Sequence, residues 1–421
     1  MKTLALKKKD MTSVVSPAGS QVFLFSKTHS PPAKGSGASH FPDSPVPLFS
    51  GEIQDAFLNA FPGVPAGQAF VDEALKQMGA LGFSVLMIRP DSRKNSEPGA
   101  SDDPFLLHAG FILEQFTRPL RAVWGLIHAD TLGCVIPEND LPVCRNLAAK
   151  IQDLLSEYQK ETVSIGIAVY PMAGFSPMDA VLNALKALTH AAALGPGSRV
   201  VLDAVSLNIS GDRLYQAGDL PGAVEEFQKA LQLDPSSVNV HNSLGVCYGM
   251  MEMYDAAEAE FDAAMRLKPD EVMALYNMGV IRLLTGRRET ALDFFMKAAA
   301  IDDGIFELAL LTGKLHLETG NPEKARPFLE KALNCRPNSG AALRTLGACF
   351  SALNLLREAV AVYTRAVKNN PSDAESFSRL GQLYDAIGEN PEIARLFCQQ
   401  SVAIAPENEI YSQRLHKLMQ K

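Results

Sequence analysis

A histidine and an aspartate stand two residues apart in the turn of an expected β-hairpin. They are His128 and Asp130, and both residue types can bind a divalent metal ion. A protein metal site uses at least three such ligands, and no third one lies nearby in the sequence. We therefore interpret the pair as part of a solvated turn, and we expect neither a metal nor another cofactor.

The other residues of types that often take part in catalysis or metal binding are mostly expected in the core. His241 and His316 fall on expected core positions, and the chain shows neither a phosphate-binding glycine loop nor a Ser/His/Asp arrangement. The cysteines lack metal-ligand spacing. Several of them fall at repeat core positions, where we interpret them as small buried hydrophobes, and this fits a reducing cytoplasm. The cysteines are Cys134, Cys144, Cys247, Cys335, Cys349 and Cys398.

Residues 54–203 alternate between strand-like and helix-like patterns. Phe83–Ile88 (FSVLMI) is a continuous apolar run, and Thr162–Tyr170 (TVSIGIAVY) is rich in β-branched residues that alternate with small or polar ones. The expected order is helix, β, α, β, β, α, β, α, β, which predicts an α+β domain with one central sheet. Further strands are expected at 121–127, 131–136 and 198–202, and helices at 104–116, 141–158 and 177–194.

From residue 204 onward, small residues recur with a period of 34. A period of this length indicates stacked pairs of antiparallel helices. Glycine and alanine let the paired helices approach closely, and a proline often ends the second helix because it cannot continue the hydrogen-bond ladder. The glycines are Gly211, Gly245, Gly279, Gly313, Gly347 and Gly381, and the alanines are Ala230, Ala264, Ala298, Ala332 and Ala366.

This pattern resembles the tetratricopeptide repeat. In the sixth copy, one extra residue displaces Ala394, Phe397 and Pro406 by one position. The resemblance implies an all-α solenoid that binds other proteins. We expect six helix pairs at 204–237, 238–271, 272–305, 306–339, 340–373 and 374–408, and then a capping helix at 409–421.

Several segments of residues 54–203 resemble the GGDEF domain of bacterial diguanylate cyclases. Gly63–Phe70 (GVPAGQAF) is similar to that family's opening TGLPNRRAF segment, and Val163–Pro171 (VSIGIAVYP) to its late central strand. Ala187–Gly195 (ALTHAAALG) stands where the family has ALYRAKEAG. The resemblance implies a multidomain protein, with a cyclase-like α+β domain followed by the solenoid.

The polar residues that the cyclase family uses for catalysis are largely missing. Arg89 occupies the position of a metal-binding aspartate and would repel a cation. His128 replaces a glycine of the signature turn, Thr131 replaces an acid, and Ala192 replaces a lysine of the last helix. Asp91 falls on another aspartate of the family, where we expect a surface or capping role. The resemblance therefore implies a degenerate domain that is not an enzyme.

Composition excludes several classes of partner and structure. A net charge of −8 argues against nucleic acid as a main partner. No stretch of about 18 or more apolar residues is present, so we expect no membrane span. Residues 1–53 are rich in Pro, Ser and Gly in several places, and we expect a largely disordered linker.

The concave side of the solenoid is where we expect the functional surface. The resemblance to tetratricopeptide repeats implies that positions 2, 5, 9 and 12 of each first helix face this groove. In the third and fourth copies these positions are mostly apolar, and exposed apolar surface indicates a partner site. An alternative is that some of these residues pack against neighbouring repeats. The predicted groove residues are Asn242, Met273, Tyr276, Val280, Leu283, Leu310, Lys314 and Leu317, with Tyr276 as an exposed anchor.

Two classes of function remain open. The first is a non-catalytic scaffold or regulator that binds a partner peptide or helix in the groove. The second is a sensor of guanine nucleotide or cyclic di-GMP, in which the cyclase-like domain modulates partner binding. In that case Arg199 and Lys94 could contact phosphate.

The absence of the family's catalytic residues predicts that the protein does not make cyclic di-GMP. The purified protein is incubated with GTP and Mg²⁺ or Mn²⁺, and the products are separated by chromatography. No product is expected, because Arg89 excludes the metal. Turnover of about 1 s⁻¹ or faster, the ordinary enzyme scale, would contradict this prediction.

Overall fold

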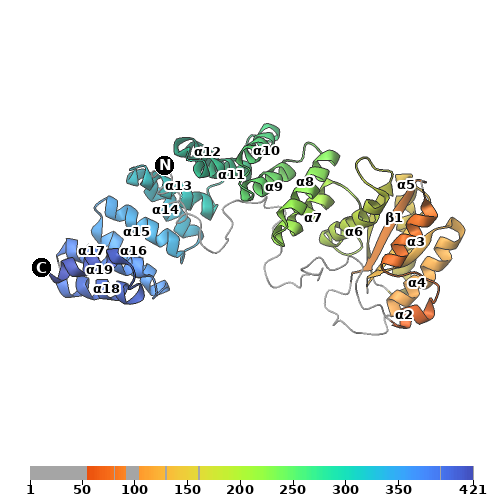
Figure 1. The fold of residues 1–421 in the computed structure, drawn as a ribbon, viewed down its shortest axis with the longest axis horizontal. Helices are drawn as coiled ribbons and strands as arrows, with labels where there is room; N and C mark the ends of the chain where they lie inside the picture. Colours follow the sequence, from red (N-terminus) through yellow and green to blue (C-terminus); the bar gives the residue numbers. More distant parts are fainter. Residues whose placement is uncertain are drawn as a thin grey trace. The chain divides into compact units, whose positions relative to one another are not determined.

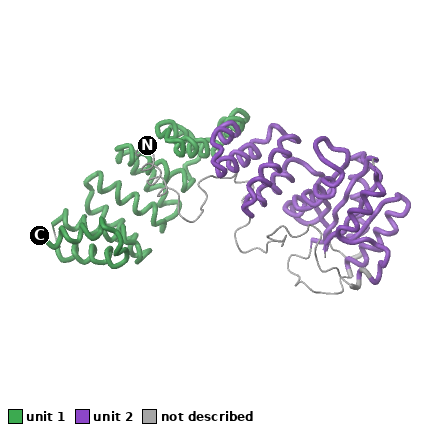
Figure 2. The backbone as a smooth tube through the Cα atoms, viewed as in Figure 1, with its two compact units in different colours: residues 1–24, 261–421 green, residues 25–260 purple. Residues whose placement is uncertain are grey.

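A computed structural model describes residues 55–79, 81–91, 104–128, 130–159, 162–388 and 390–420. The prediction for residues 1–53 and the phosphate contact expected of Lys94 lie outside the described residues. By its internal contacts the chain divides within helix α10 (Tyr254–Leu267). The described residues on the two sides of this division, 55–260 and 261–420, form two units (Figure 2).

A five-stranded sheet is the centre of the first unit (Figure 1). Its strand order is β2-β3-β1-β4-β5; β4 and β5 are parallel, and the other neighbours are antiparallel. In the central strand β1, Leu86 lies opposite Cys134 of β3 and Ile167 of β4. The predicted α+β fold with one sheet is confirmed. The strands are β1 (Phe83–Pro90), β2 (Val123–His128), β3 (Thr131–Ile136), β4 (Val163–Tyr170) and β5 (Arg199–Val201).

Helices cover both faces of this sheet, which explains why β1 is apolar along its length. Val85 and Met87 belong to the core that the sheet shares with α3 and α6. Leu86 and Ile88 point to the other side, into the core shared with α4 and α5. The order of elements is the predicted one except that two helices, instead of one, precede β1 and that a short 3-10 helix precedes β2. The helices are α2 (Asp55–Ala60), α3 (Gln68–Met78), α4 (Pro104–Thr117), the short η3 (Arg118–Leu120), α5 (Leu141–Gln159) and α6 (Pro177–Leu194).

The helices from residue 204 onward form six pairs, as the 34-residue period predicts. All six first helices begin 34 residues apart. These are α7 (Ala204–Gln216), α9 (Val238–Met250), α11 (Val272–Leu284), α13 (Phe306–Glu318), α15 (Gly340–Ala352) and α17 (Ala374–Ile387). The second helices are α8 (Leu220–Leu233), α10, α12 (Arg288–Ile301), α14 (Pro322–Cys335), α16 (Leu356–Asn369) and α18 (Pro391–Ile404).

Within a pair, a glycine of the first helix lies against a bulky side chain of the second. A β-carbon at Gly279 would collide with the ring of Phe295, and one at Gly347 would collide with the ring of Tyr363. Both rings are almost fully buried. The recurrent glycines are therefore required by close helix packing and not by backbone conformation.

The sixth pair keeps this contact with a different residue from the one expected. The extra residue shifts the start of α18 by one, so that Cys398 lies against Gly381. Phe397, which we expected in that place, instead packs beside Tyr384, with the ring centroids 5.5 Å apart. The expected final helix is present as α19 (Glu409–Met419), and its Leu418 is buried in a cluster with Cys398.

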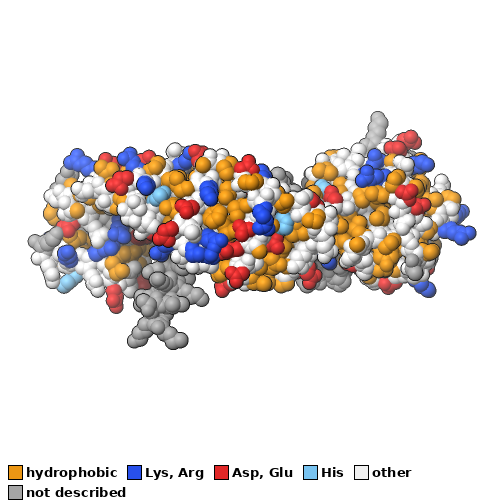
Figure 3. Space-filling model, turned by 90° about the horizontal axis from the view of Figure 1, so that it is seen from above, with side chains coloured by type: hydrophobic (Ala, Val, Ile, Leu, Met, Phe, Trp, Pro, Cys, Tyr) orange, Lys and Arg blue, Asp and Glu red, His pale blue; other side chains and the backbone are white. Residues whose placement is uncertain are grey.

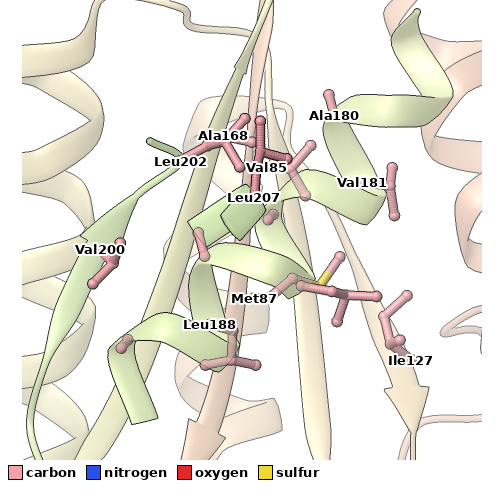
Figure 4. Close-up of a cluster of buried hydrophobic side chains, with 14 of the residues drawn as sticks. Val85, Met87, Ile127, Ala168, Ala180, Val181, Leu188, Val200, Leu202 and Leu207 are labelled. Atoms are coloured by element: carbon pink, nitrogen blue, oxygen red, sulfur yellow. The ribbon is translucent and has the colours of Figure 1, made fainter. Parts of the chain in front are cut away.

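The core of the sheet continues into the first helical repeats without a break. One cluster of buried side chains includes Val85 of β1, Leu188 of α6 and Leu207 of α7 (Figure 4). Lys186 of α6 also forms an ion pair of 2.8 Å with Glu226 of α8, and both side chains are mostly buried. Repeat one thus packs on the α+β domain. The domain boundary expected at residue 204 remains a prediction.

Because β4 and α6 are in close contact at Gly166, a methyl group added there should strongly destabilise the fold. A β-carbon at Gly166 would collide with main-chain atoms of Ala184 and Leu188. We expect Gly166→Ala to lower the free energy of unfolding by about 3 kcal/mol, because main-chain atoms cannot move aside as side chains do. Gly63→Ala is the matched control, since no atom lies within 4 Å of its added carbon. Equal urea midpoints for the two variants would contradict this packing.

Candidate partner-binding groove

Asp91 has a structural role at the end of β1. Its carboxylate accepts hydrogen bonds from the Ser164 hydroxyl of β4 and from the backbone N–H of Gly197, the latter at 2.7 Å. These bonds join the end of β1 to β4 and to the turn before β5. We expected a surface or capping role for Asp91. Its two carboxylate oxygens instead accept hydrogen bonds that link the end of β1 to β4 and to the turn before β5.

The turn between β2 and β3 places the Asp130 carboxylate beside the Thr131 hydroxyl. Thr131 donates a hydrogen bond of 2.9 Å to Asp130. Burial lowers the pKa of His128, Asp130 opposes this shift, and the nearby charge of Arg89 adds to it. Among the described residues, no group of three or more histidine, cysteine, aspartate or glutamate side chains could hold a metal ion. Arg199, which could contact phosphate in the nucleotide-sensor alternative, is exposed on β5.

Four of the eight predicted groove residues are buried, three of them on α11, which corrects the expectation that they are exposed. Tyr276 is 1% exposed, and Met273 and Val280 are also buried in α11. The Tyr276 ring packs beside Phe295 of α12, with the ring centroids 5.7 Å apart. Burial accordingly raises the pKa of the Tyr276 hydroxyl. Tyr276 is a core residue of the third repeat and not an exposed anchor.

Four other predicted residues are partly exposed on neighbouring first helices. They are Leu283 of α11 and Leu310, Lys314 and Leu317 of α13, and we call them the central stripe. The three α13 residues are spaced by four and then three positions, so they share one face of the helix. Burial lowers the pKa of Lys314, and the negative charges of Glu318 and Glu375 oppose this shift. The stripe thus combines three leucines with one cationic group.

The first repeats carry polar residues at the corresponding positions. Asn242 of α9 is buried, and it belongs to the other unit from the central stripe. On α7, burial raises the pKa of Asp212 to about 7. The Oδ1 atoms of Asn208 and Asp212 are buried and have no hydrogen-bond partner among the described residues. The apolar part of the predicted surface is therefore confined to α11 and α13.

Sequence reasoning did not single out two arginines near the end of the repeats. Arg379 of α17 and Arg414 of α19 are both partly buried. Arg414 lies close enough to Arg379 for the second charge to lower its pKa, although burial is the larger cause. The sequence did contain one signal for them, since Arg379 and Arg414 are each the sixth residue of their helix.

Family models match the helical part of the chain in three segments. Models described as tetratricopeptide or TPR repeats cover residues 211–251, 251–305 and 316–383. The segments that these models match are tetratricopeptide repeats. These matches confirm the family that the period of glycine and alanine indicated. None of the described helices is long and apolar enough to cross a membrane.

Curated relatives resemble this chain over part of their length. The chain is 23% identical to the human protein O-mannosyl-transferase TMTC1 over 49% of this chain and 24% of that protein. It is 27% identical to the BBSome complex member BBS4 of Bos taurus, over 32% and 26% of the two chains. For Hsp70-Hsp90 organizing protein 2 of Arabidopsis thaliana the identity is 27%, over 43% and 32%. The chain spans between about a quarter and a third of the length of these relatives.

Solved structures with similar repeats include YrrB, described as a TPR protein with an unusual peptide-binding site. The identity is 23% and the TM-score 0.43, over 45% of this chain and 97% of YrrB. For pilF of Pseudomonas aeruginosa the identity is 19% and the TM-score 0.45, over 51% and 97% of the two chains.

The burial of Tyr276 predicts that its truncation destabilises the repeats. We expect Tyr276→Ala to reduce the free energy of unfolding by about 3–5 kcal/mol, because it leaves a cavity beside Phe295. Leu310→Ala should cost only about 1 kcal/mol, since that side chain is already partly exposed. Urea unfolding followed by circular dichroism measures both. A loss below about 0.5 kcal/mol for Tyr276→Ala would mean that the side chain is exposed after all.

Proposed function

We propose that this protein is a non-catalytic scaffold or regulator that binds a partner peptide or helix through its tetratricopeptide repeats. The observation that carries the proposal is the central stripe, where three leucines of adjacent first helices remain partly exposed. Partly exposed apolar side chains at helical spacing suit the apolar face of a short helix or an extended peptide. Lys314, placed among them, favours a partner with a nearby acidic group.

The α+β domain is proposed to be a degenerate, inactive GGDEF-like domain. Its order of helices and strands is the one that the family resemblance implies. Its polar positions support the loss of catalysis: Arg89 stands where a metal ligand would be, and each Asp91 carboxylate oxygen accepts a structural hydrogen bond. In this proposal the domain serves as a folded support for the first repeat.

A role in bringing proteins together also agrees with the names of some relatives. Three of them, from Arabidopsis thaliana, Glycine max and Triticum aestivum, are named Hsp70-Hsp90 organizing proteins. The matches cover only 24% and 25% of the two mannosyl-transferases, so their activity is not proposed for this chain. We propose a cytoplasmic location, because the cysteines are free thiols, as expected in a reducing compartment.

The space-filling surface gives a further reason to look for a specific partner site. On the face drawn in Figure 3, acidic and basic side chains are interspersed among apolar ones over the helical repeats. A surface of mixed charge does not favour a polyanion such as nucleic acid. Recognition would then depend on local features such as the central stripe.

The central stripe can be tested with peptides selected from a displayed library against the full-length protein. We expect Leu310→Ser combined with Leu317→Ser to weaken the selected peptide at least about tenfold, equivalent to about 1.4 kcal/mol. Met296→Ser is the matched control, because Met296 is 42% exposed on α12, a second helix. Affinity is measured by titration calorimetry, with melting temperature as the folding control. Unchanged affinity in the double variant, or an equal loss in the control, would contradict the assignment of the groove.

A nucleotide sensor is the second candidate function, and one observation favours it. The charge of Arg89 reaches both His128 and Arg213, so cationic groups gather near the end of β1. Such groups suit a phosphate. Calorimetric titration of the full-length protein with GTP and cyclic di-GMP tests this candidate, with Arg89→Ala as the comparison. Heat that the Arg89→Ala variant retains, or no heat at all, would exclude a nucleotide site at this position.

A further inference from the structure

Two polar side chains of α7 are in contact inside the first repeat. Asn208 and Asp212 are four residues apart, so they lie one turn apart on the same side of the helix. The Nδ2 atom of Asn208 lies 3.5 Å from Oδ2 of Asp212, which is long for a hydrogen bond. Asn208 is buried, with 2% of its surface exposed. The weak contact therefore lies in the interior of the repeat.

Each of the two side chains also has an oxygen that lacks a donor. Oδ1 of Asn208 and Oδ1 of Asp212 are both buried, and neither has a hydrogen-bond partner among the described residues. An unmet acceptor in the interior is unfavourable, and it is more so when it carries a charge. An ionised Asp212 would therefore bring negative charge into a site that already contains an unmet amide oxygen.

A single proton on Asp212 would supply the missing donor. A carboxylic acid and a primary amide form two parallel hydrogen bonds: the amide N–H donates to one acid oxygen, and the acid O–H donates to the amide oxygen. The contact between Nδ2 and Oδ2 is the first of these bonds, and the two unmet Oδ1 atoms are the pair required for the second. Burial acts in the same direction, because it raises the pKa of Asp212 to about 7.

In the described helices packed on α7, each lysine and histidine acts on a carboxylate other than Asp212. These helices are α6, α8 and α9. Arg213, the neighbour of Asp212 in α7, donates to Thr189 of α6 at 3.5 Å. The other cationic groups act as follows: Lys186 on Glu226, Lys229 on Asp179, His190 on Asp203 and His241 on Glu260. The described residues therefore do not compensate an ionised Asp212 with an ion pair.

The other titratable groups around Asp212 do not add a charge to the site. Burial raises the pKa of the Cys247 thiol of α9 to about 12, and the charge of Asp212 contributes to this shift. Burial likewise raises the pKa of Tyr215 of α7. Tyr248 of α9 bonds to a side chain of α8, and Glu225 of α8 is exposed. The thiol and the phenol groups thus stay neutral in the pH range where Asp212 titrates.

We propose that Asp212 holds a proton in its pair with Asn208 and releases it as the pH rises through neutrality, so that the pair is a pH-sensitive lock in the first repeat. The protonated pair is joined by two hydrogen bonds. Loss of the proton removes the second bond and leaves a buried carboxylate without an ion-pair partner among the described residues. The lock goes beyond the proposed function, because it concerns the first repeat itself and needs no partner.

The lock predicts how the stability of the chain depends on pH. Between its ordinary pKa of 3.8 and the raised value of about 7, Asp212 is protonated in the folded chain and ionised in the unfolded chain. Its contribution to stability is therefore complete below about pH 4 and is lost as the pH rises through about 7. From about pH 5 to about pH 8, this loss should lower the folding equilibrium constant by a factor on the order of one hundred.

The variant Asp212→Asn isolates this contribution. Its amide keeps the shape of the neutral acid and can form both hydrogen bonds, but it does not titrate. Urea unfolding is followed by the fluorescence of Trp124, the one tryptophan of the chain, which lies in the same unit as α7. The loss should disappear in Asp212→Asn and persist in the control Asp153→Asn, an exposed position of α5. An equal pH dependence in wild type and Asp212→Asn would overturn the lock.

A direct test follows the two side chains in the full-length protein by NMR. The Cγ resonance of Asp212, identified by its absence from Asp212→Asn, should titrate with a midpoint near 7. The side-chain N–H resonances of Asn208 should shift with the same midpoint, because the pair opens when the proton leaves. A midpoint below about 5, close to that of an ordinary aspartate, would overturn the lock. Asn208 resonances that do not move during the titration would overturn it as well, since burial alone would then hold the proton.

Discussion

The helical repeats depend on the close contact between a glycine of each first helix and a bulky side chain of the second. Gly211 lies against Phe227, and Gly279 lies against Phe295 in the same manner. Any β-carbon at these glycines would overlap the neighbouring ring, so the helices could not approach as they do. This contact fixes the rotation of each helix, and therefore which of its residues face the interior of the pair.

Much of the fold follows from residues that are close in sequence. The helix starts repeat because the small residues that allow close helix packing recur with the same period. The β1 run is apolar because helices cover both sheet faces. The role of Asp91 could not be predicted, since it depends on Gly197, more than one hundred residues later in the chain. Such a bond exists only after the sheet has formed.

The candidate site was predicted less well, for a physical reason. Periodicity tells which face of a helix a residue occupies, but not how deeply the neighbouring helices cover it. Tyr276 shares a face with the partly exposed Leu283, yet it packs on Phe295 and is buried. Arg379 and Arg414 come together only because α19 packs on α17 and α18, which no pattern within one repeat reveals.

The two ends of the helical array are covered by elements that are not repeats. Helix α6 packs on α7 at the first repeat, and α19 packs on α18 at the last. In a stacked array, an uncovered terminal face can accept another copy of the unit. With both faces covered, neither end of the described helical array leaves a bare repeat face for end-to-end association.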